Sequence, residues 1–179
     1  MLKAVFLDRD GVINKASVID GKPYPPRNLD ELELIPGVDQ AILQLRDRGY
    51  FCIVVTNQPD VARGKTSKET VESINQFLIQ HLAIHEIISC YHDDHENCDC
   101  RKPKPGSLLK AALKYNIDLN KSFMVGDRWR DIEAGHNAGC KTFFIDYRYN
   151  EKQPQNPTYK VTSLTDAVNI ILNELHENN

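Results

Sequence analysis

The chain alternates between short apolar segments and segments with helical periodicity, and this alternation restricts the fold more than any other feature. The apolar segments span residues 3–7, 50–58, 86–92, 121–127 and 141–147, and each ends in or is directly followed by polar residues. The helical segments span residues 38–48, 67–82, 106–115, 130–138 and 164–176. Strands separated by helices favour a parallel sheet that is covered by helices on both faces. We therefore expect an α/β fold with three layers and a mainly parallel sheet.

The length and composition are those of one globular domain. The chain has 179 residues, of which 41% are hydrophobic and 26% charged. We expect residues 1–179 to form a single Rossmann-like domain. The N-terminal stretch MLKAVFLDRD meets charged residues too early for a signal peptide, and no apolar run approaches the roughly 20 residues that a membrane span requires. We therefore expect a cytoplasmic protein without a membrane partner.

The charge balance restricts the partners. A net charge of −3 creates no field that would hold nucleic acid non-specifically, so we expect no nucleic-acid partner. A small domain of mixed surface charge is compatible with a monomer.

Three segments carry local signals. The helix over residues 67–82 has a stripe of apolar residues and is expected to begin with a capping box formed by Thr66 and Glu69. Residues 11–36 contain several prolines without a sustained period, which predicts a long ordered loop or a small flap. Residues 150–159 are expected to form a more solvated loop.

Polar residues follow the apolar segments where the strands should end. Asp8 and Asp10 follow the first segment, Thr56 closes the second, and Asp127 closes the fourth. Ligands of open parallel sheets bind outside the carboxyl ends of the strands, so we expect these groups to converge. With Lys102 they form a set suited to phosphoryl transfer, because Mg²⁺ prefers oxygen ligands and a lysine offsets phosphate charge.

The two aspartates of DRD can take different catalytic roles. Residues two apart in extended chain point to the same side, so Asp8 and Asp10 can both face a phosphate. One can attack phosphorus, while the other protonates the leaving oxygen and later deprotonates water. A DxD pair alone is weak evidence, because acidic pairs are common on surfaces.

A cluster of cysteine and histidine lies directly before a run of cations, in the stretch CYHDDHENCDCRKPKPG. Cys90, His92, Cys98 and Cys100 supply four ligands, which would close a tetrahedral Zn²⁺ site without an open position for water. Such a site is structural. His95 is the alternative to His92, because it lies in the same short loop, and an unmetallated loop of free thiols is the remaining possibility.

Four stretches occur in one order between residues 6 and 140: FLDRDGVIN, VVTNQ, RKPKPG and VGDRWRDIEAGHNAGC. They resemble the four motifs of the haloacid dehalogenase superfamily of phosphatases. The TNQ stretch and the cysteine-rich loop before RKP resemble its branch of sugar bisphosphate and histidinol-phosphate phosphatases. Fewer than 50 residues separate Asp8 from Thr56 and Thr56 from Lys102, which leaves no room for a large cap domain.

The resemblance implies a role for each matching catalytic position. Asp8 would be the nucleophile and a Mg²⁺ ligand, and Asp10 the general acid and base, with its backbone carbonyl on the same ion. Thr56 would hold the transferring phosphoryl group, Lys102 would neutralise the phosphate, and Asp127 would complete the Mg²⁺ site.

The resemblance also implies roles for residues around the catalytic set. Asp131 would anchor Lys102 or a water on the metal rather than the metal itself, unless Asp127 and Asp131 only cap the helix that follows. The zinc ligands would pin the loop that carries Lys102. The expected substrate-binding residues are Asn57, Gln58, Arg63, Arg101 and Arg128.

The substrate implied is a small phosphorylated sugar, with the 7-phosphate of a heptose 1,7-bisphosphate as the first candidate. Histidinol phosphate is the alternative, and a docking module without catalytic activity is the second alternative. Members of this branch usually have Ser-Gly after TNQ, whereas this chain has Pro59 and Asp60. Pro59 stiffens the turn and Asp60 adds negative charge near the expected second phosphate, so this departure bears on the substrate rather than on the reaction.

Overall fold

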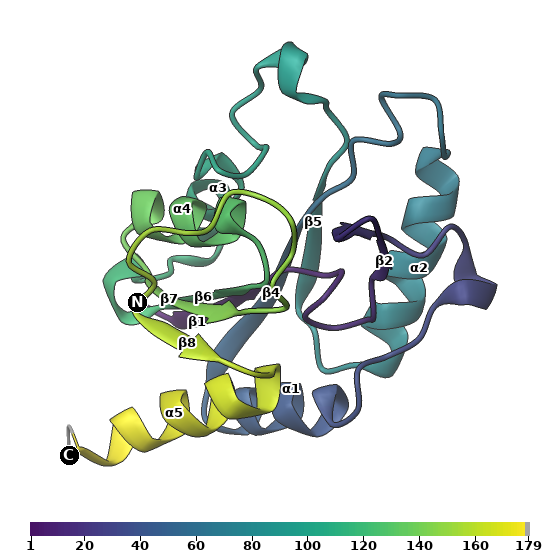
Figure 1. The fold of residues 1–179 in the computed structure, drawn as a ribbon. Helices are drawn as coiled ribbons and strands as arrows, with labels where there is room; N and C mark the ends of the chain where they lie inside the picture. The colour runs from purple at the N-terminus through teal and green to yellow at the C-terminus, as the bar shows by residue number, and fades with distance from the viewer. Residues whose placement is uncertain (178–179) are drawn as a thin grey trace.

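A computed structural model describes residues 1–177, and these residues build a six-stranded sheet between two layers of helices (Figure 1). The strand order is β5 (Glu86–Cys90), β4 (Tyr50–Asn57), β1 (Lys3–Leu7), β6 (Phe123–Gly126), β7 (Lys141–Ile145) and β8 (Tyr159–Val161). Every neighbouring pair is parallel. The predicted three-layer α/β fold is therefore confirmed.

Alternation along the strands divides the core between the two faces of the sheet. Val5 and Leu7 of β1 pack on one face, and Ala4 and Phe6 pack on the other. The first face is covered by α1 (Val38–Asp47), α2 (Lys68–His81) and α5 (Leu164–Glu177). The second is covered by α3 (Gly106–Tyr115) and α4 (Trp129–Ala138). Full burial of one such large apolar side chain stabilises the fold by about 1.5 to 3 kcal/mol, so both faces hold the sheet in place.

The segment expected as a loop or flap contains a β-hairpin. Strands β2 (Ser17–Ile19) and β3 (Lys22–Tyr24) pair antiparallel across a two-residue turn. Asp20 and Gly21 both have positive φ, at 52° and 74°, as a type I′ turn requires. The Asp-Gly dipeptide was the sequence signal for this hairpin, but the neighbouring prolines obscured the two short strands. A 3₁₀ helix, η1 (Leu29–Glu31), follows the hairpin.

Two local expectations need correction. Helix α2 is capped by Ser67, whose hydroxyl accepts a hydrogen bond from the backbone N–H of Thr70 at 3.1 Å, so the capping box at Thr66 was wrong. The solvated loop ends earlier than expected, because Tyr159 already begins β8 and pairs with β7. A strand of three residues is too short to show periodicity, and only its pairing partner identifies it.

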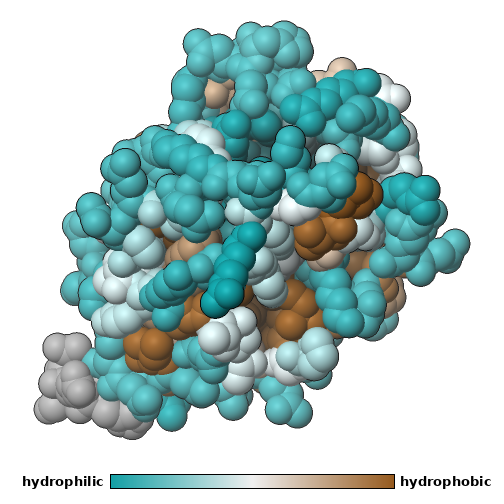
Figure 2. Space-filling view, viewed as in Figure 1, coloured by the Kyte–Doolittle hydropathy of each residue, from teal (hydrophilic) through white to brown (hydrophobic). Residues whose placement is uncertain are grey.

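The remaining elements are two 3₁₀ helices, η2 (Asp94–Glu96) in the cysteine-rich loop and η3 (Leu119–Lys121) before β6. Within residues 1–177, no helix is both long and apolar enough to cross a membrane. The face shown in Figure 2 is mainly hydrophilic, with apolar side chains reaching the surface in separate patches. Such isolated patches are ordinary for a folded protein.

Candidate active site

Three neighbouring strands bring the predicted carboxylates together. β1 lies between β4 and β6, and Asp8 directly follows β1 as Asp127 directly follows β6. Asp131, in the first turn of α4, joins them, and one carboxylate oxygen from each of the three residues lies within 4.8 Å of the other two. All three residues are buried. The convergence that the strand ends predicted is thus present.

Lys102 lies at the centre of this cluster. Its ammonium group donates to Asp8 Oδ1 at 2.8 Å and to the backbone carbonyl of Val55 at 2.6 Å, and it lies 2.6 Å from Asp131 Oδ1. The three N–H bonds of the ammonium thus match three acceptors. Burial by itself lowers the pKa of Lys102, but the carboxylates of Asp131 and Asp8 raise it above its ordinary value. The amine therefore stays protonated at neutral pH.

Burial and mutual repulsion raise the pKa values of the Asp8 and Asp127 carboxyl groups. Burial, with repulsion from Asp131, raises the pKa of Asp8 to about 6, although Lys102 opposes the shift. Burial and the charges of Asp8 and Asp131 raise the pKa of Asp127 well above its ordinary range. Three acidic groups around one ammonium leave excess negative charge in a buried space.

The donor set fits a divalent cation that prefers oxygen ligands. Asp127 Oδ2 accepts a hydrogen bond from the Tyr149 hydroxyl at 2.9 Å. Its other oxygen, Oδ1, is buried and has no hydrogen-bond partner among residues 1–177. A buried oxygen without a partner is unfavourable, and a cation such as Mg²⁺ would satisfy it and offset the excess charge of the cluster.

Gly11 allows the chain to turn directly beneath this site. Its φ is +92°, in the region that favours glycine, and an added Cβ would lie 2.0 Å from Asp127 Oδ2. Both conditions exclude a side chain at this position. The glycine of the motif therefore brings the backbone after Asp10 against the Asp127 carboxylate.

Residues 56–58, at the end of β4, orient the catalytic groups. Gln58 Nε2 donates to Thr56 Oγ1 at 2.9 Å and to Asp10 Oδ2 at 2.8 Å. Because the Thr56 oxygen accepts this bond, its own O–H remains available for a phosphoryl oxygen. Both ends of the Asn57 amide bind the backbone of Lys102, at 2.9 Å and 3.1 Å, and its expected contact with substrate remains a prediction. Asn57 therefore clamps the lysine in place.

Asp131 combines the two roles that the sequence left as alternatives. Its Oδ2 accepts a hydrogen bond from the backbone N–H of Arg128 at 3.0 Å, which caps the N-terminus of α4. Its Oδ1 pairs with Lys102, as the anchoring role predicted. One carboxylate therefore ties the start of the helix to the catalytic lysine.

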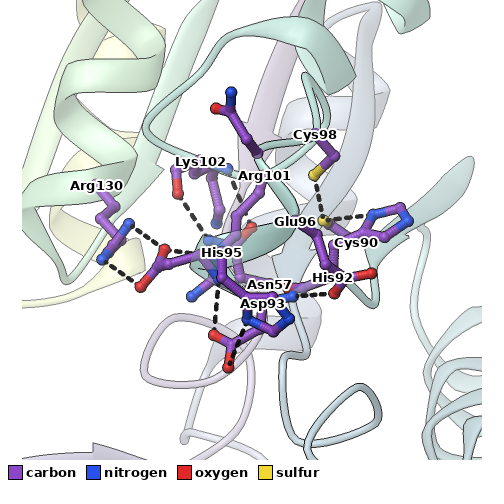
Figure 3. Close-up of polar contacts among 12 residues, drawn as sticks. Asn57, Cys90, His92, Asp93, His95, Glu96, Cys98, Arg101, Lys102 and Arg130 are labelled. Carbon is purple, nitrogen blue, oxygen red and sulfur yellow. Dashed lines mark hydrogen bonds and ion pairs between the residues drawn. The ribbon is translucent and has the colours of Figure 1, made fainter.

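The four expected zinc ligands lie together in one cage. Figure 3 shows three of them, Cys90, His92 and Cys98, side by side. Cys100 Sγ lies 3.1 Å from Cys90 Sγ, 3.4 Å from Cys98 Sγ and 3.4 Å from His92 Nδ1. Four ligands about 2.3 Å from a tetrahedral Zn²⁺ have mutual separations only slightly larger than these, so the cage fits such an ion. The side chain of His95 is 79% exposed and stands outside the cage, which favours His92.

Two carboxylates of the cysteine-rich loop hold arginines around the site (Figure 3). Asp94 Oδ1 accepts from Arg101 Nε at 2.8 Å and from Arg130 Nη1 at 3.1 Å. Asp93 pairs with Arg63, with N–O distances of 2.6 and 2.7 Å. The expected contact between Arg101 and substrate remains a prediction, and the structure directs this side chain to Asp94. Arg130 was not predicted, although it stands two residues after Arg128 in the same motif.

A cavity of about 330 Å³ opens above the carboxylates and reaches the flap. Among the predicted residues it is lined by Asp8, Asp10, Thr56, Asn57, Gln58, Arg63, Lys102 and Arg128. Residues 22–25, in the segment expected as a flap, also line it, and so does Arg130, which was not among the predicted residues. Arg128 pairs with Glu151, which holds its guanidinium at the rim.

The residues that departed from the family pattern lie on the wall of this cavity. Pro59 and Asp60 both line it. Asp60 Oδ1 lies 3.4 Å from Arg63 Nη1, so its charge is partly offset. The effect of Asp60 on a bound anion is therefore smaller than its charge alone suggests.

Comparison with known proteins places the sequence in one group. The family model of the haloacid dehalogenase-like hydrolases matches residues 26–139. D-glycero-β-D-manno-heptose-1,7-bisphosphate 7-phosphatase of Pasteurella multocida (strain Pm70) is 39% identical, over 96% of this chain and 97% of the relative. The protein of that name from Vibrio cholerae (serotype O1) is 41% identical, over 78% of each chain.

Solved structures agree with the sequence comparison. The crystal structure of D,D-heptose 1,7-bisphosphate phosphatase from B. bronchiseptica, complexed with magnesium and phosphate, has a TM-score of 0.84 and 30% sequence identity to this chain. The similarity covers 97% of this chain and 99% of that one.

Proposed function

This chain belongs to the haloacid dehalogenase-like hydrolases, and we propose that it is a Mg²⁺-dependent phosphatase that removes the 7-phosphate of D-glycero-D-manno-heptose 1,7-bisphosphate. One observation carries the proposal. Lys102 contacts both Asp8 and Asp131 in a buried cluster, beside an Asp127 oxygen that has no partner among the described residues. A nucleophile, a fixed cation and an incomplete oxygen-ligand set are what phosphoryl transfer requires.

The first step is attack by Asp8 on phosphorus. One Asp8 oxygen is held by Lys102 at 2.8 Å, which fixes the carboxylate in place. An O–P bond forms to Asp8 as the ester O–P bond breaks, producing an aspartyl-phosphate. The O–H of Thr56 donates to a phosphoryl oxygen, and the Lys102 charge offsets the negative charge of the transition state.

Asp10 handles the protons in both steps. It lines the cavity and donates a proton to the leaving sugar oxygen as the ester bond breaks. It then takes a proton from the water that attacks the aspartyl-phosphate, and this second step releases phosphate and regenerates Asp8. Gln58 holds the Asp10 carboxyl beside Thr56 throughout.

Two metal ions belong to the proposal. Asp8, Asp127 and the backbone carbonyl of Asp10 would hold Mg²⁺, which supplies positive charge to the phosphate and to the attacking carboxylate. Cys90, His92, Cys98 and Cys100 would hold Zn²⁺ in a closed, structural site.

The zinc cage would act through the chain that follows it. Arg101 and Lys102 come directly after Cys100, and a fixed cage places them before substrate arrives. The clamp from Asn57 holds the same backbone from the opposite side.

Two observations support the heptose substrate, namely the names of the relatives and the cations that line the cavity. The curated relatives are named for the β anomer, which makes it the first candidate here. Arg63, Arg128 and Arg130 line the cavity above the carboxylates, where they would hold a second phosphate. Both histidinol phosphate and a docking module without activity remain alternatives, and the buried catalytic cluster argues against the second.

The decisive experiment measures phosphate release, with Mg²⁺ present, from both anomers of the heptose 1,7-bisphosphate and from histidinol phosphate. We expect the β-heptose compound to be hydrolysed fastest and Asp8→Asn to abolish the reaction. Preference for histidinol phosphate would overturn the proposed heptose substrate. Activity that survives in Asp8→Asn would overturn the aspartyl-phosphate mechanism.

A further inference from the structure

Arg9, between the two aspartates of the DRD motif, has no exposed surface. Removing a guanidinium from water is unfavourable unless its charge and its N–H donors find partners. A buried arginine at the centre of a catalytic motif therefore requires a physical explanation. The mechanism above uses both neighbours of Arg9 but assigns nothing to Arg9 itself.

The guanidinium grips the carboxyl group of Asp10. Nε of Arg9 donates to Asp10 Oδ1 at 3.2 Å, and Nη2 donates to Asp10 Oδ2 at 3.2 Å. This two-point contact fixes the orientation of the carboxyl plane as well as its position. Asn14 and Gln58 add one donor to each oxygen, at 3.0 and 2.8 Å. The Asp10 side chain is 15% exposed and faces the cavity.

The other end of the guanidinium is held by Asn75 of α2. Nη1 of Arg9 donates to Asn75 Oδ1 at 3.0 Å, and Asn75 Nδ2 donates to Ser89 Oγ of β5 at 3.0 Å. Asn75 is 2% exposed and lies among the apolar residues of α2 that face the core. A polar side chain buried there is tolerated because both ends of its amide are paired. The chain of contacts thus runs from β5 through α2 to Asp10.

We propose that Arg9 and Asn75 are positioning residues that aim the carboxyl group of Asp10 at the leaving-group oxygen. This inference rests on the proposed function, in which Asp10 donates the proton to that oxygen. Arg9 exchanges no proton. The ester O–P bond breaks, the bond from Asp8 to phosphorus forms, and the Asp10 proton passes to the leaving oxygen. Arg9 acts only by limiting rotation of the donor.

The test varies the leaving group. Protonation matters for a poor leaving group such as a sugar alkoxide and little for p-nitrophenolate, which departs without a proton. We would measure kcat/KM, which reports the steps through phosphoryl transfer, for a series from alkyl phosphates to p-nitrophenyl phosphate. In Arg9→Met and Asn75→Leu we expect a loss of about 10²-fold on the alkyl phosphates and of less than about 3-fold on p-nitrophenyl phosphate.

The control is Leu78→Ala, a buried apolar position of the same helix whose side chain has no polar atom to pair with Arg9. It should lower thermal stability and leave the dependence on the leaving group unchanged. Asn75→Leu preserves the motif, so a folding failure of Arg9→Met leaves the test intact. A loss that is equal across the series would show a purely structural role and overturn the inference, as would an unchanged series.

The series also separates this inference from the proposed function. If the wild type hydrolyses aryl phosphates but not the heptose compound, the proposed substrate is wrong. The leaving-group series still tests the roles of Arg9 and Asn75. A wild type that hydrolyses no phosphate ester would end both proposals.

Discussion

The catalytic cluster and the cysteine-rich loop meet at Lys102, but different forces hold them. The carboxylates follow strands whose register and packing place them, and the Lys102 and Asp131 side chains are each 2% exposed. The loop between β5 and α3 contains one 3₁₀ helix, and the Asp94 side chain is 55% exposed. A sheet positions side chains through its core, whereas a loop of this kind needs cross-links, here four metal-ligating residues and several ion pairs.

The difference predicts where substitutions will be most costly. Removing one charge from the buried cluster leaves its partners without compensation in a space that water does not reach. Water can replace much of what is lost when a solvent-exposed ion pair of the loop is broken. The following substitutions test the comparison in order of decreasing effect.

Lys102→Met should have the largest effect. It removes the cation from between Asp8 and Asp131 and leaves their repulsion uncompensated. We expect kcat to fall by about 10³-fold, measured as phosphate release from the heptose bisphosphate. Lys104→Met is the matched control, because the Lys104 side chain is 42% exposed and its ammonium contacts only loop residues, Asn97 at 2.8 Å and Asp99 at 3.5 Å. Comparable losses in both variants would contradict a special role for the buried lysine.

Gly11→Ala tests the close approach under Asp127. We expect a loss of about 10²-fold in kcat and weaker Mg²⁺ dependence, because the new Cβ displaces the Asp127 carboxylate. Gly49→Ala separates this from backbone strain, since Gly49 has φ +79° but no atom within 4 Å of an added Cβ. That control should lower the free energy of unfolding by about 1 to 2 kcal/mol and spare activity. Equal activity losses would mean that strain alone is responsible.

His92→Ala tests whether the cage holds the loop. We expect loss of bound Zn²⁺, a lower Tm, and a fall of about 10-fold in kcat/KM, because Lys102 is still clamped by Asn57. His95→Ala should retain the metal, since His95 lies outside the cage. The measurements are metal content, thermal unfolding and phosphate release. Retention of Zn²⁺ in His92→Ala together with its loss in His95→Ala would reverse the ligand assignment.

Asp94→Asn should have the smallest effect. It weakens the pairs with Arg101 and Arg130 without touching the carboxylate cluster. We expect KM for the bisphosphate to change by about 2- to 3-fold with kcat retained, because the Asp94 carboxylate is 55% exposed and water can replace part of each pair. Asp99→Asn, in the same loop, should change neither constant. A large fall in kcat would show that the loop acts on the reaction itself.

Sequence reasoning succeeded where a residue acts through its place on an element. Asp8 and Asp127 could be brought together because both follow strands, and parallel strands end at one edge. The cage was accessible because its ligands lie within eleven residues of one another. The partners of Asn57 and Arg101 were harder to predict, because the contacts of a side chain depend on its rotamer and on groups that are distant in the sequence. The hairpin had an Asp-Gly signal, whereas β8 had none of comparable strength.

The sequence by itself determined the alternation of strands and helices, the order of the motifs and the kinds of chemical group available. These properties depend on residue type and spacing, which are local. Only the tertiary structure decided that Lys102 lies between Asp8 and Asp131 and that Arg130 reaches the cavity. It also decided that a buried arginine links Asp10 to Asn75 on α2. Such contacts join residues far apart in the chain, and they exist only once both faces of the sheet are packed.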